Sequence, residues 1–467
     1  MPVDLKKPLA WKTATGDAAA MLTQLQPNIL KAHVRDHLQI LLVQFSDKAE
    51  ARAFLKAVAG KMKSAHKQLL EAERFQSAGT PGTPYVGLGI TFAGYEKLGI
   101  PQAKIPGHAA APFNASMRSA ESVGVLGDPP VASWEQPYRH TIHAVVLIGD
   151  ASKAAVTAKR AEINALFTPK VKLLGEETGL SQKNARGEGI EHFGYIDGRS
   201  QPLFLVEEIA GEPKAKWDPA FGLGRVLVAD TAAPKPAQHF GSFFVLRKLE
   251  QNVRAFHQAE KDLADKLGLT GEDRKRAGAT IVGRFRDGTA LTAHSQALGD
   301  DPIPNDFNYD RDDQGARCPF HGHIRKTNPR GSGGGEPQPG ERLHLMARRG
   351  QTFGKRTDDP NAELPPSARP TGGVGLLFMA FNAEIENQFQ FTQAAWVNNA
   401  GFPFKRPATA KEPGLDQVIG QGTRPKAECP VKWGTTTNKL VDAAPQTVTM
   451  KGGEYFFMPS IAFLKGL

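Results

Sequence analysis

A dense set of chemically active side chains lies in residues 318–330, which read CPFHGHIRKTNPR. The run contains two histidines, His321 and His323, and three cations, Arg325, Lys326 and Arg330. Neutral histidine is a common ligand of iron and zinc, and arginine and lysine bind carboxylates or phosphates. The run therefore predicts a site for a group that needs a nitrogen ligand at its centre and cations at its rim. Haem, with its two propionates, is such a group.

Two further motifs contain residues suited to acid–base or charge-stabilising chemistry. In FGYIDGRSQP, Asp197 lies between Gly194 and Gly198, and glycines let the backbone approach a flat ligand closely. An aspartate between glycines is by itself a common turn. In LMARRGQTFG, Arg348 and Arg349 are adjacent on a predicted strand, so their side chains point to opposite faces. Only one of them can face a ligand, and a lone arginine is more often part of a surface salt bridge.

Together, the motifs HIRKTNPR, RRGQTFG and FGYIDGRSQP resemble the signature motifs of the dye-decolorising peroxidases, and the resemblance extends over nearly the whole chain. It implies that His323 is the axial ligand of the iron in haem b. It also implies that Asp197, framed by Gly194 and Gly198, lies with Arg348 on the distal face of the haem. There a carboxylate can take a proton from one oxygen of hydrogen peroxide and deliver it to the other, while an arginine stabilises negative charge.

The resemblance also implies which residues surround the haem. Leu376 and Phe378, in the motif GLLF, match apolar residues of the distal pocket, although a core strand would have the same pattern. Gly350 stands where some bacterial members of the family have asparagine, so this pocket has one fewer polar group. Arg325, which follows the axial histidine by two positions, is the expected partner of a haem propionate.

A carboxylate is expected behind the axial histidine, because such a histidine usually donates its second ring N–H to an acceptor that raises the basicity of the ring. The family has an aspartate for this role well downstream, and Asp416 in LDQVIGQ is at the matching position. Glu384 and Glu386 are alternatives. His321 stands where relatives often have a small residue, and we interpret it as a loop histidine.

The chain contains two cysteines, Cys318 and Cys429, and no CxxC or CxxCH pair. Both precede a proline, and we interpret them as buried, unreactive thiols. Such cysteine usage is typical of a reducing compartment. The N-terminal residues lack the apolar core of a signal peptide, and no stretch reaches the roughly 18 apolar residues of a membrane span. We therefore expect a cytoplasmic protein that does not enter a membrane.

The elements that must position these residues are predicted from hydrophobic periodicity. In the first half, strands are expected at residues 37–45, 85–92, 143–150 and 171–177. Amphipathic helices follow the first and the third of these strands. The resulting order, β-α-β-β-α-β, is the ferredoxin-like arrangement.

The second half is expected to repeat this order of strands and helices. Strands are expected at residues 241–249 and 374–381, with a long helix over about residues 250–267 and a second helix capped by Asn382. The chain is expected to end in a hairpin around residues 452–453.

We therefore expect an α+β fold of two ferredoxin-like domains with antiparallel sheets and helices. Residues 1–200 form the N-terminal domain and residues 201–467 the C-terminal, haem-binding domain. The periodicity supports two sheets with helices, and the ferredoxin-like character of both domains depends largely on the family resemblance. The low-complexity insert at residues 330–341, RGSGGGEPQPGE, is expected to be a flexible surface loop.

The charge balance argues against a nucleic-acid partner. The 58 lysine and arginine residues outnumber the 48 aspartate and glutamate residues, which gives a net charge of +10. However, the cations are scattered, and six tyrosines and five tryptophans offer few rings for base stacking. Attraction of anionic small molecules is the simpler interpretation.

The sequence as a whole is interpreted as a haem b peroxidase that uses hydrogen peroxide to oxidise bulky dyes and phenolic or other aromatic donors. Such donors are too large for a pocket walled by Leu376 and Phe378, so oxidation through a surface tryptophan or tyrosine is expected. Two alternatives stay open. A haem-binding or iron-releasing protein would need His323 but gain little from Asp197 and Arg348, and a non-haem protein would use the histidine–arginine run to bind an anionic metabolite. A homo-oligomer is compatible with the sequence.

Overall fold

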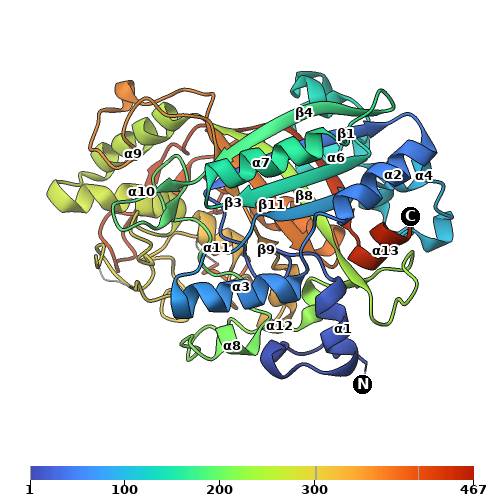
Figure 1. The fold of residues 1–467 in the computed structure, drawn as a ribbon. Coiled ribbons are helices and arrows are strands. Elements are labelled where there is room, and N and C mark those ends of the chain that lie inside the picture. The colour runs from blue at the N-terminus through green and yellow to red at the C-terminus, as the bar shows by residue number, and fades with distance from the viewer. Residues whose placement is uncertain (1, 300–301, 409) are drawn as a thin grey trace.

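An antiparallel β-sheet that closes on itself forms the centre of the protein (Figure 1). The computed structural model describes residues 2–299, 302–408 and 410–467. The strands of the closed ring are β1 (His37–Phe45), β2 (Tyr85–Ile90), β3 (Ala144–Asp150), β4 (Val171–Leu180), β8 (Phe240–Gln251), β10 (Gln351–Phe353), β11 (Gly375–Asn382) and β14 (Val448–Met458). They follow the order β8-β14-β2-β3-β1-β4-β10-β11, and β11 pairs again with β8. Two short strands, β7 (Val228–Ala229) and β9 (Ala347–Arg348), pair with β8 and β11.

Each half of the chain contributes four strands in the same ferredoxin-like order, β2-β3-β1-β4 and β10-β11-β8-β14. Phe457 of β14 pairs with Ile90 of β2, and Phe353 of β10 pairs with Gly179 of β4. These two pairings join the edge strands of the two halves into one sheet. The expected α+β architecture is confirmed, with one addition: the two sheets are continuous.

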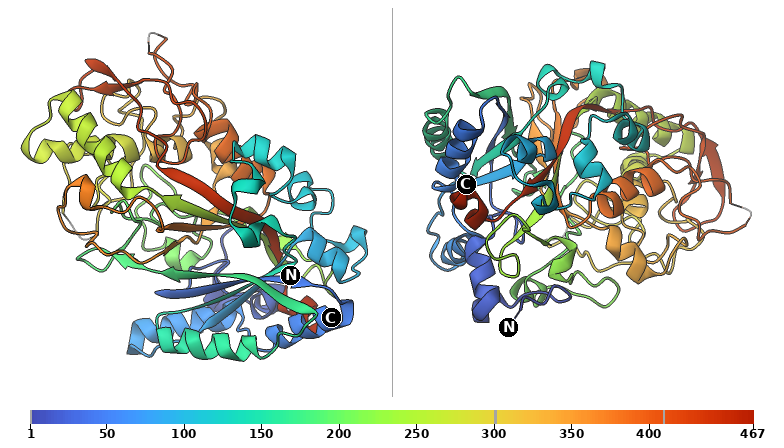
Figure 2. Two further views of the ribbon diagram at one scale, coloured as in Figure 1. Left: turned by 90° about the horizontal axis from the view of Figure 1, so that it is seen from above. Right: turned by 90° about the vertical axis from the view of Figure 1, so that its right-hand side faces the viewer.

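Helices cover the outer face of the first half's sheet. α2 (Lys48–Ala59) and α7 (Lys153–Asn164) pack against its strands (Figure 2). Each begins at a side-chain cap that the sequence indicates, because Asp47 accepts a hydrogen bond from the Glu50 N–H and Ser152 from the Ala155 N–H. Since the other face of the sheet packs on the core, β3 is buried at every position.

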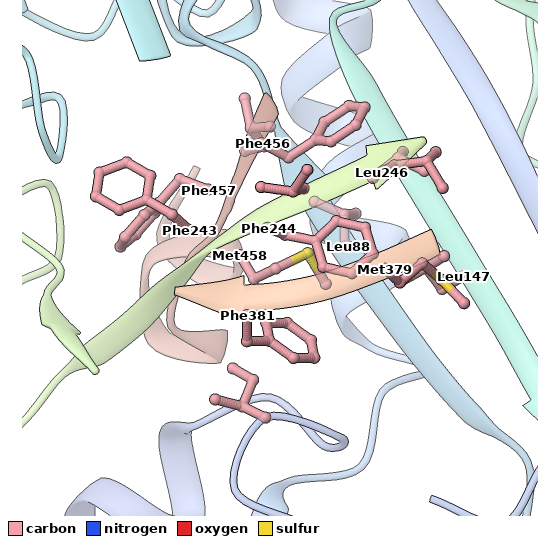
Figure 3. Packing of buried hydrophobic residues seen from close by; sticks show 14 of the residues in the cluster. Leu88, Leu147, Phe243, Phe244, Leu246, Met379, Phe381, Phe456, Phe457 and Met458 are labelled. Carbon is pink, nitrogen blue, oxygen red and sulfur yellow. The ribbon is translucent and has the colours of Figure 1, made fainter. Parts of the chain in front are cut away.

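The main core cluster joins strands from both halves (Figure 3). Phe244 of β8 contacts Phe381 of β11 and Phe456 of β14, with ring centroids 5.1 and 6.3 Å apart. Leu88 of β2 and Leu147 of β3 belong to the same cluster. Burial of these large apolar groups is the main favourable term that holds the halves together.

The second half adds long loops and short helices beside its strands. α9 (Val253–Leu267) and α10 (Lys275–Val282) lie together at one end of the molecule (Figure 1). α11 (His323–Thr327) follows a long loop, and two π-helical turns, η9 (Glu386–Gln390) and η10 (Thr392–Val397), follow β11. The remaining longer helices and strands are α1 (Gly16–Gln24), α3 (Ala65–Ala78), α4 (Phe92–Lys97), α5 (Ala111–Ala115), α6 (Ala120–Leu126), α8 (Val206–Ile209), α12 (Gln338–Glu341), α13 (Ile461–Gly466), β5 (Gln182–Lys183), β6 (Gly189–Ile190), β12 (Ala427–Pro430) and β13 (Asn438–Val441).

Two local expectations are wrong. The C-terminal segment is one strand, β14, rather than a hairpin, and Gly452 lies at a β-bulge where a Cβ atom would collide with the ring of Tyr138. Asn382 is the last residue of β11 and not a helix cap. The turn after it is held by Gln388, whose side-chain oxygen accepts hydrogen bonds from the backbone N–H groups of residues 383 and 384.

The low-complexity insert at residues 330–341 is not a free surface loop, so the expectation of a flexible loop there is also wrong. The carboxylate of Glu341 is buried and accepts hydrogen bonds from the N–H groups of Gly331 and Gly333. Glu336 in the same segment hydrogen-bonds His344 over 2.7 Å. The glycines therefore allow the backbone to fold around two carboxylates.

The proposed division at residues 200 and 201 stays a prediction, because each half also has contacts with the other. Leu9 of the N-terminal arm pairs with Leu205, and α13 packs on α2. Across the described ranges, no helix combines the length and apolarity needed to cross a membrane.

Candidate active site

A cavity in the second half brings together residues from the three sequence motifs. His323 lines it from α11, Asp197 from the loop after β6, and Arg348 from β9. Asp197 and Arg348 are about 150 positions apart in the sequence. The fold, and not sequence proximity, therefore places a carboxylate, a guanidinium group and an imidazole around one space.

His323 is held by a buried carboxylate. Its Nδ1 atom lies 2.8 Å from Oδ2 of Asp416, and Asp416 is fully buried. The other carboxylate oxygen accepts hydrogen bonds from the N–H groups of Val418 and Ile419, each at 2.8 Å. Burial by itself would raise the pKa of Asp416, but its contact with His323 and these hydrogen bonds hold that pKa below its usual value. The Nδ1 contact leaves Nε2 as the ring nitrogen available to a metal.

The structure thus favours Asp416 among the three carboxylates considered from the sequence. Glu384 and Glu386 are both exposed, on the turn that leads into η9. Exposed carboxylates of that turn cannot provide the dry, fixed acceptor that a ligand histidine requires.

Local backbone geometry places Asp197 at the cavity wall. Gly194 and Gly198 have φ angles of +93° and +84°, which favour glycine. Oδ1 of Asp197 accepts a hydrogen bond of 2.7 Å from the N–H of Gly198. Oδ2 lies on the side of Gly350, where a Cβ atom would come within 3.5 Å of it. The missing side chain of Gly350 therefore leaves room next to this oxygen.

Glu191, which no sequence motif singled out, holds the loop that carries Asp197. Its carboxylate accepts hydrogen bonds from the N–H groups of Phe193 and Tyr195, at 2.8 and 3.0 Å, and from the side chain of Gln251. Burial raises the pKa of Glu191 to about 7, although these three donors oppose the shift. A glutamate three residues before a glycine turn was the only local signal.

Arg348 and Arg349 point to opposite sides of the sheet, as expected for neighbours on a strand. Arg348 lines the cavity, and its Nη2 atom donates a hydrogen bond of 2.8 Å to the carbonyl of Arg199. Arg349 is buried on the other side, where it donates to the carbonyls of Asn28 and Ile29 over 2.9 Å each. Of these two neighbouring arginines, only Arg348 is thus able to contact a ligand in the cavity.

The apolar wall contains the two residues expected from GLLF. Leu376 and Phe378 both line the cavity from β11. The ring of Phe378 packs beside that of Phe389 in η9, with centroids 6.0 Å apart. Both residues are also part of a core strand, so the pocket and core interpretations hold together.

Arg325 does not line the cavity, which contradicts its expected contact with a propionate. It is fully buried and donates hydrogen bonds to Oδ2 of Asp312, at 3.0 Å, and to the carbonyl of Cys318, at 2.6 Å. Its guanidinium carbon lies 4.6 and 4.4 Å from the ring centroids of Tyr309 and Phe320. Arg325 therefore stabilises the loop before α11.

Two other buried arginines do face the cavity. Arg284 and Arg330 both bind Ser200 Oγ and Asn305 Oδ1, and Arg330 also binds the carbonyl of Phe307. Burial lowers the pKa of Arg284 to about 10 and that of Arg330 to about 9. Because these acceptors are neutral, the pair retains positive charge that suits an anionic ligand. Arg330 was visible as a motif cation, whereas Arg284 had no distinguishing sequence signal.

The other candidate ligands lie away from the cavity. His321 is buried with its Nε2 atom 3.8 Å from the sulfur of Cys429, and burial lowers its pKa to about 4. Cys318 and Cys429 are free and buried, and burial raises the pKa of each thiol to about 12. The interpretation of the cysteines as buried, unreactive thiols fits this placement.

The chemistry of the donors fits haem. Within residues 2–299, 302–408 and 410–467, no cluster of three or more histidine, cysteine, aspartate or glutamate side chains could hold a metal ion. Haem supplies four ring nitrogens to its iron, so His323 would be the one protein ligand that it needs. The apolar wall suits the macrocycle, and Arg284 and Arg330 suit its carboxylates.

Comparisons with known proteins agree with this interpretation. Residues 24–181 match the family model described as "DyP dimeric alpha+beta barrel domain". The "Multifunctional dye peroxidase DyP2" of Amycolatopsis sp. (strain ATCC 39116 / 75iv2) is 56% identical over 473 residues, and the match covers 100% of both chains. A solved structure of DyP2 from Amycolatopsis sp. ATCC 39116 has a TM-score of 0.96 at 55% identity, with 100% of each chain covered.

More distant structures preserve the same fold. A DyP-type peroxidase of Anabaena sp. has a TM-score of 0.90 at 36% identity, covering 99% of this chain and 98% of that one. A dye-decolorizing peroxidase solved in complex with 2,6-dimethoxyphenol has a TM-score of 0.76 at 26% identity, covering 95% of this chain and 98% of that one.

Replacement of the axial histidine tests the ligand assignment. His323→Ala should abolish or greatly weaken haem retention, because the nitrogen ligand is lost. His321→Ala is the matched control and should retain haem, since His321 lies beside Cys429. The haem-to-protein absorbance ratio after gel filtration measures both. Haem loss in the His321 variant alone would overturn the assignment.

Replacement of the carboxylate behind His323 tests its electronic role. Asp416→Asn should leave haem bound but raise the reduction potential of the iron, because a neutral acceptor makes the imidazole a weaker donor. Spectroelectrochemical titration measures the potential. An unchanged potential with normal haem content would show that Asp416 only fixes the ring in place.

Proposed function

The chain belongs to the dye-decolorising peroxidase family, and on this premise we propose that its cavity binds haem b through His323 and reduces hydrogen peroxide with Asp197 and Arg348. One observation carries the assignment of roles. Two motifs about 150 residues apart place a carboxylate and a guanidinium group at the cavity that His323 lines. A haem carrier or an iron-releasing protein would gain nothing from that pair.

Asp197 is proposed to move the proton. Hydrogen peroxide must lose a proton from the oxygen that binds and gain one on the oxygen that leaves as water. Oδ1 of Asp197 is fixed by the N–H of Gly198, so Oδ2, beside Gly350, is the oxygen placed to accept and return that proton. A positioned acid–base group of this kind typically contributes about 10²–10⁴-fold.

Arg348 is proposed to stabilise the negative charge that develops as the bond between the peroxide oxygens breaks. One side of its guanidinium group is anchored on the carbonyl of Arg199, which fixes its direction. Arginine stays protonated throughout, so it acts as a fixed cation and not as a base. Bound haem would supply the iron that takes up the two oxidising equivalents of peroxide.

Arg284 and Arg330 are proposed as the partners of the haem propionates, in place of Arg325. Their acceptors, Ser200 and Asn305, are neutral, and both arginines are buried. Two carboxylates next to them would balance their charge and form charge-assisted hydrogen bonds.

The donors are proposed to be dyes and phenolic or other aromatic compounds. Relatives are named dye peroxidases, and one related structure contains 2,6-dimethoxyphenol. Bulky donors would be oxidised at the surface, because Leu376 and Phe378 narrow the cavity. The free thiols of Cys318 and Cys429 fit a reducing compartment, and we propose the cytoplasm.

A chain of aromatic rings suggests the route for electrons from bulky donors. His344 lines the cavity, and its ring centroid lies 5.2 Å from that of Trp396. Trp396 stacks on Phe402 at 5.4 Å, and Phe402 contacts Phe404 at 5.6 Å. Phe404 is 51% exposed. Among these four rings, Trp396 is the one that is readily oxidised, and we propose that it relays electrons from the surface.

Asp197 and Arg348 can be tested in the loaded protein. Asp197→Ala and Arg348→Leu should leave haem bound but slow its spectral response to peroxide, by about 10²-fold or more for at least one of them. Stopped-flow absorbance gives the rate. If the wild-type spectrum does not respond to peroxide, or if both variants respond as fast as wild type, the proposed function is wrong.

Trp396 is tested by comparing two donors. Trp396→Phe should reduce the turnover of a bulky anthraquinone dye several-fold and leave that of a small phenol nearly unchanged. Phenylalanine preserves the stacking on Phe402 but is much harder to oxidise. Trp134→Phe, at a buried position in the first half, is the control and should affect neither donor. An equal loss of turnover with both donors would contradict the relay role and indicate that the substitution damages the haem pocket.

A further inference from the structure

The guanidinium group of Arg35 forms hydrogen bonds with backbone carbonyls of the cavity wall. Arg35, just before β1, donates hydrogen bonds to the carbonyls of Arg349 and Gly350, the latter at 3.2 Å. Its other acceptors are the carbonyl of His33, at 3.0 Å, and the side-chain oxygen of Asn28, at 3.5 Å. All four acceptors are neutral, so the positive charge of Arg35 is not paired by its hydrogen bonds.

The segment that Arg35 contacts lies in the break between β9 and β10. Residues 349 and 350 separate these two strands, and the cavity is lined by Arg348, the last residue of β9, and by Gly350 within the break. Oδ2 of Asp197 lies within 3.5 Å of the position that a Cβ atom of Gly350 would occupy. A single glycine residue thus has Arg35 on its carbonyl and Asp197 next to its α-carbon.

Electrostatics connect the same two groups. Burial lowers the pKa of Arg35, and the negative charge of Asp197 opposes that shift, as does Tyr85.

Other charged or titratable groups face this pair. Arg349 and His33 lie beside Arg35, and the charge of Arg35 contributes to the lowered pKa of each. Arg348 and Glu191 face the same cavity as Asp197. Arg35 itself does not line the cavity, so a ligand bound there does not compete for its hydrogen bonds.

We propose that Arg35 is a positioning residue of the distal pocket. It fixes the break at residues 349 and 350, so that Arg348 and Gly350 keep their places beside Asp197. The inference rests on the proposed function, in which Asp197 receives a proton from hydrogen peroxide. It gives a residue just before β1 an influence on a cavity that His323 and Arg348 line from much later in the chain.

Three substitutions separate the charge of Arg35 from its hydrogen bonds. Arg35→Lys keeps the charge, Arg35→Gln keeps a donor for the Gly350 carbonyl, and Arg35→Met removes both. Arg52→Gln is the matched control, because Arg52 also belongs to the first half and binds only the carbonyl of Leu98. Haem content and melting temperature are measured for every variant.

Two rates are followed against pH in the haem-loaded protein: the spectral response to peroxide, and the binding of cyanide to ferric iron. Hydrogen cyanide must give up a proton when it binds, so it reports on the distal base without turnover. Loss of the hydrogen bonds from Arg35 frees the segment that places Arg348 and Gly350 beside Asp197. Both rates should therefore fall by roughly 3- to 10-fold in Arg35→Met, because a small displacement of reacting groups costs much of their effect.

The control variants decide the cause. Arg35→Gln, which keeps a donor for the Gly350 carbonyl, should lose less than Arg35→Met, and Arg52→Gln should keep both rates of wild type. Wild-type rates in Arg35→Met, with haem content and melting temperature unchanged, would refute the inference, as would an equal loss in Arg52→Gln. Loss of haem or folding in Arg35→Gln, with Arg35→Lys intact, would also count against it, because the proposed effect is confined to the pocket. The cyanide profile tests Arg35 even if wild type does not respond to peroxide, which would refute the proposed function alone.

Discussion

Closure of the central β-sheet is the constraint on which the rest of the structure depends. The junctions of β14 with β2 and of β4 with β10 join the edge strands of the two four-stranded halves into one ring. Closure also brings β9 and β10 against the first half, where Arg349 binds the carbonyls of Asn28 and Ile29. The wall that carries Arg348 is therefore held by backbone groups from the opposite end of the chain.

Within this frame, the cavity concentrates positive charge that its own carboxylates do not neutralise. Arg284 and Arg330 are buried with neutral acceptors, and burial lowers the pKa of both. Buried cations without anionic partners are unfavourable. An anionic cofactor that binds the folded protein offsets this term and stabilises the fold by mass action. A dianionic ligand bound at these two arginines would therefore stabilise the folded chain.

The two carboxylates of the proposed mechanism differ in how completely their hydrogen bonds are satisfied. Asp416 is fully buried and contacts His323 and two backbone N–H groups, so it is suited to remain ionised and to orient the ring. Asp197 has one oxygen on a backbone N–H and the other beside Gly350, so it is suited to exchange a proton. The distinction arises from the surroundings and not from residue type.

The sequence by itself determined the strands of the first half and the motif residues His323, Asp197 and Arg348, because these depend on local periodicity and short motifs. Only the tertiary structure decided which cations face the cavity. Arg325 follows His323 by two positions on α11, and residues two apart on a helix point about 200° apart, so Arg325 faces the core instead. The contact of Arg35 with Gly350 joins residues 315 positions apart. Such contacts are set by the pairing of distant strands, which no local pattern of residues encodes.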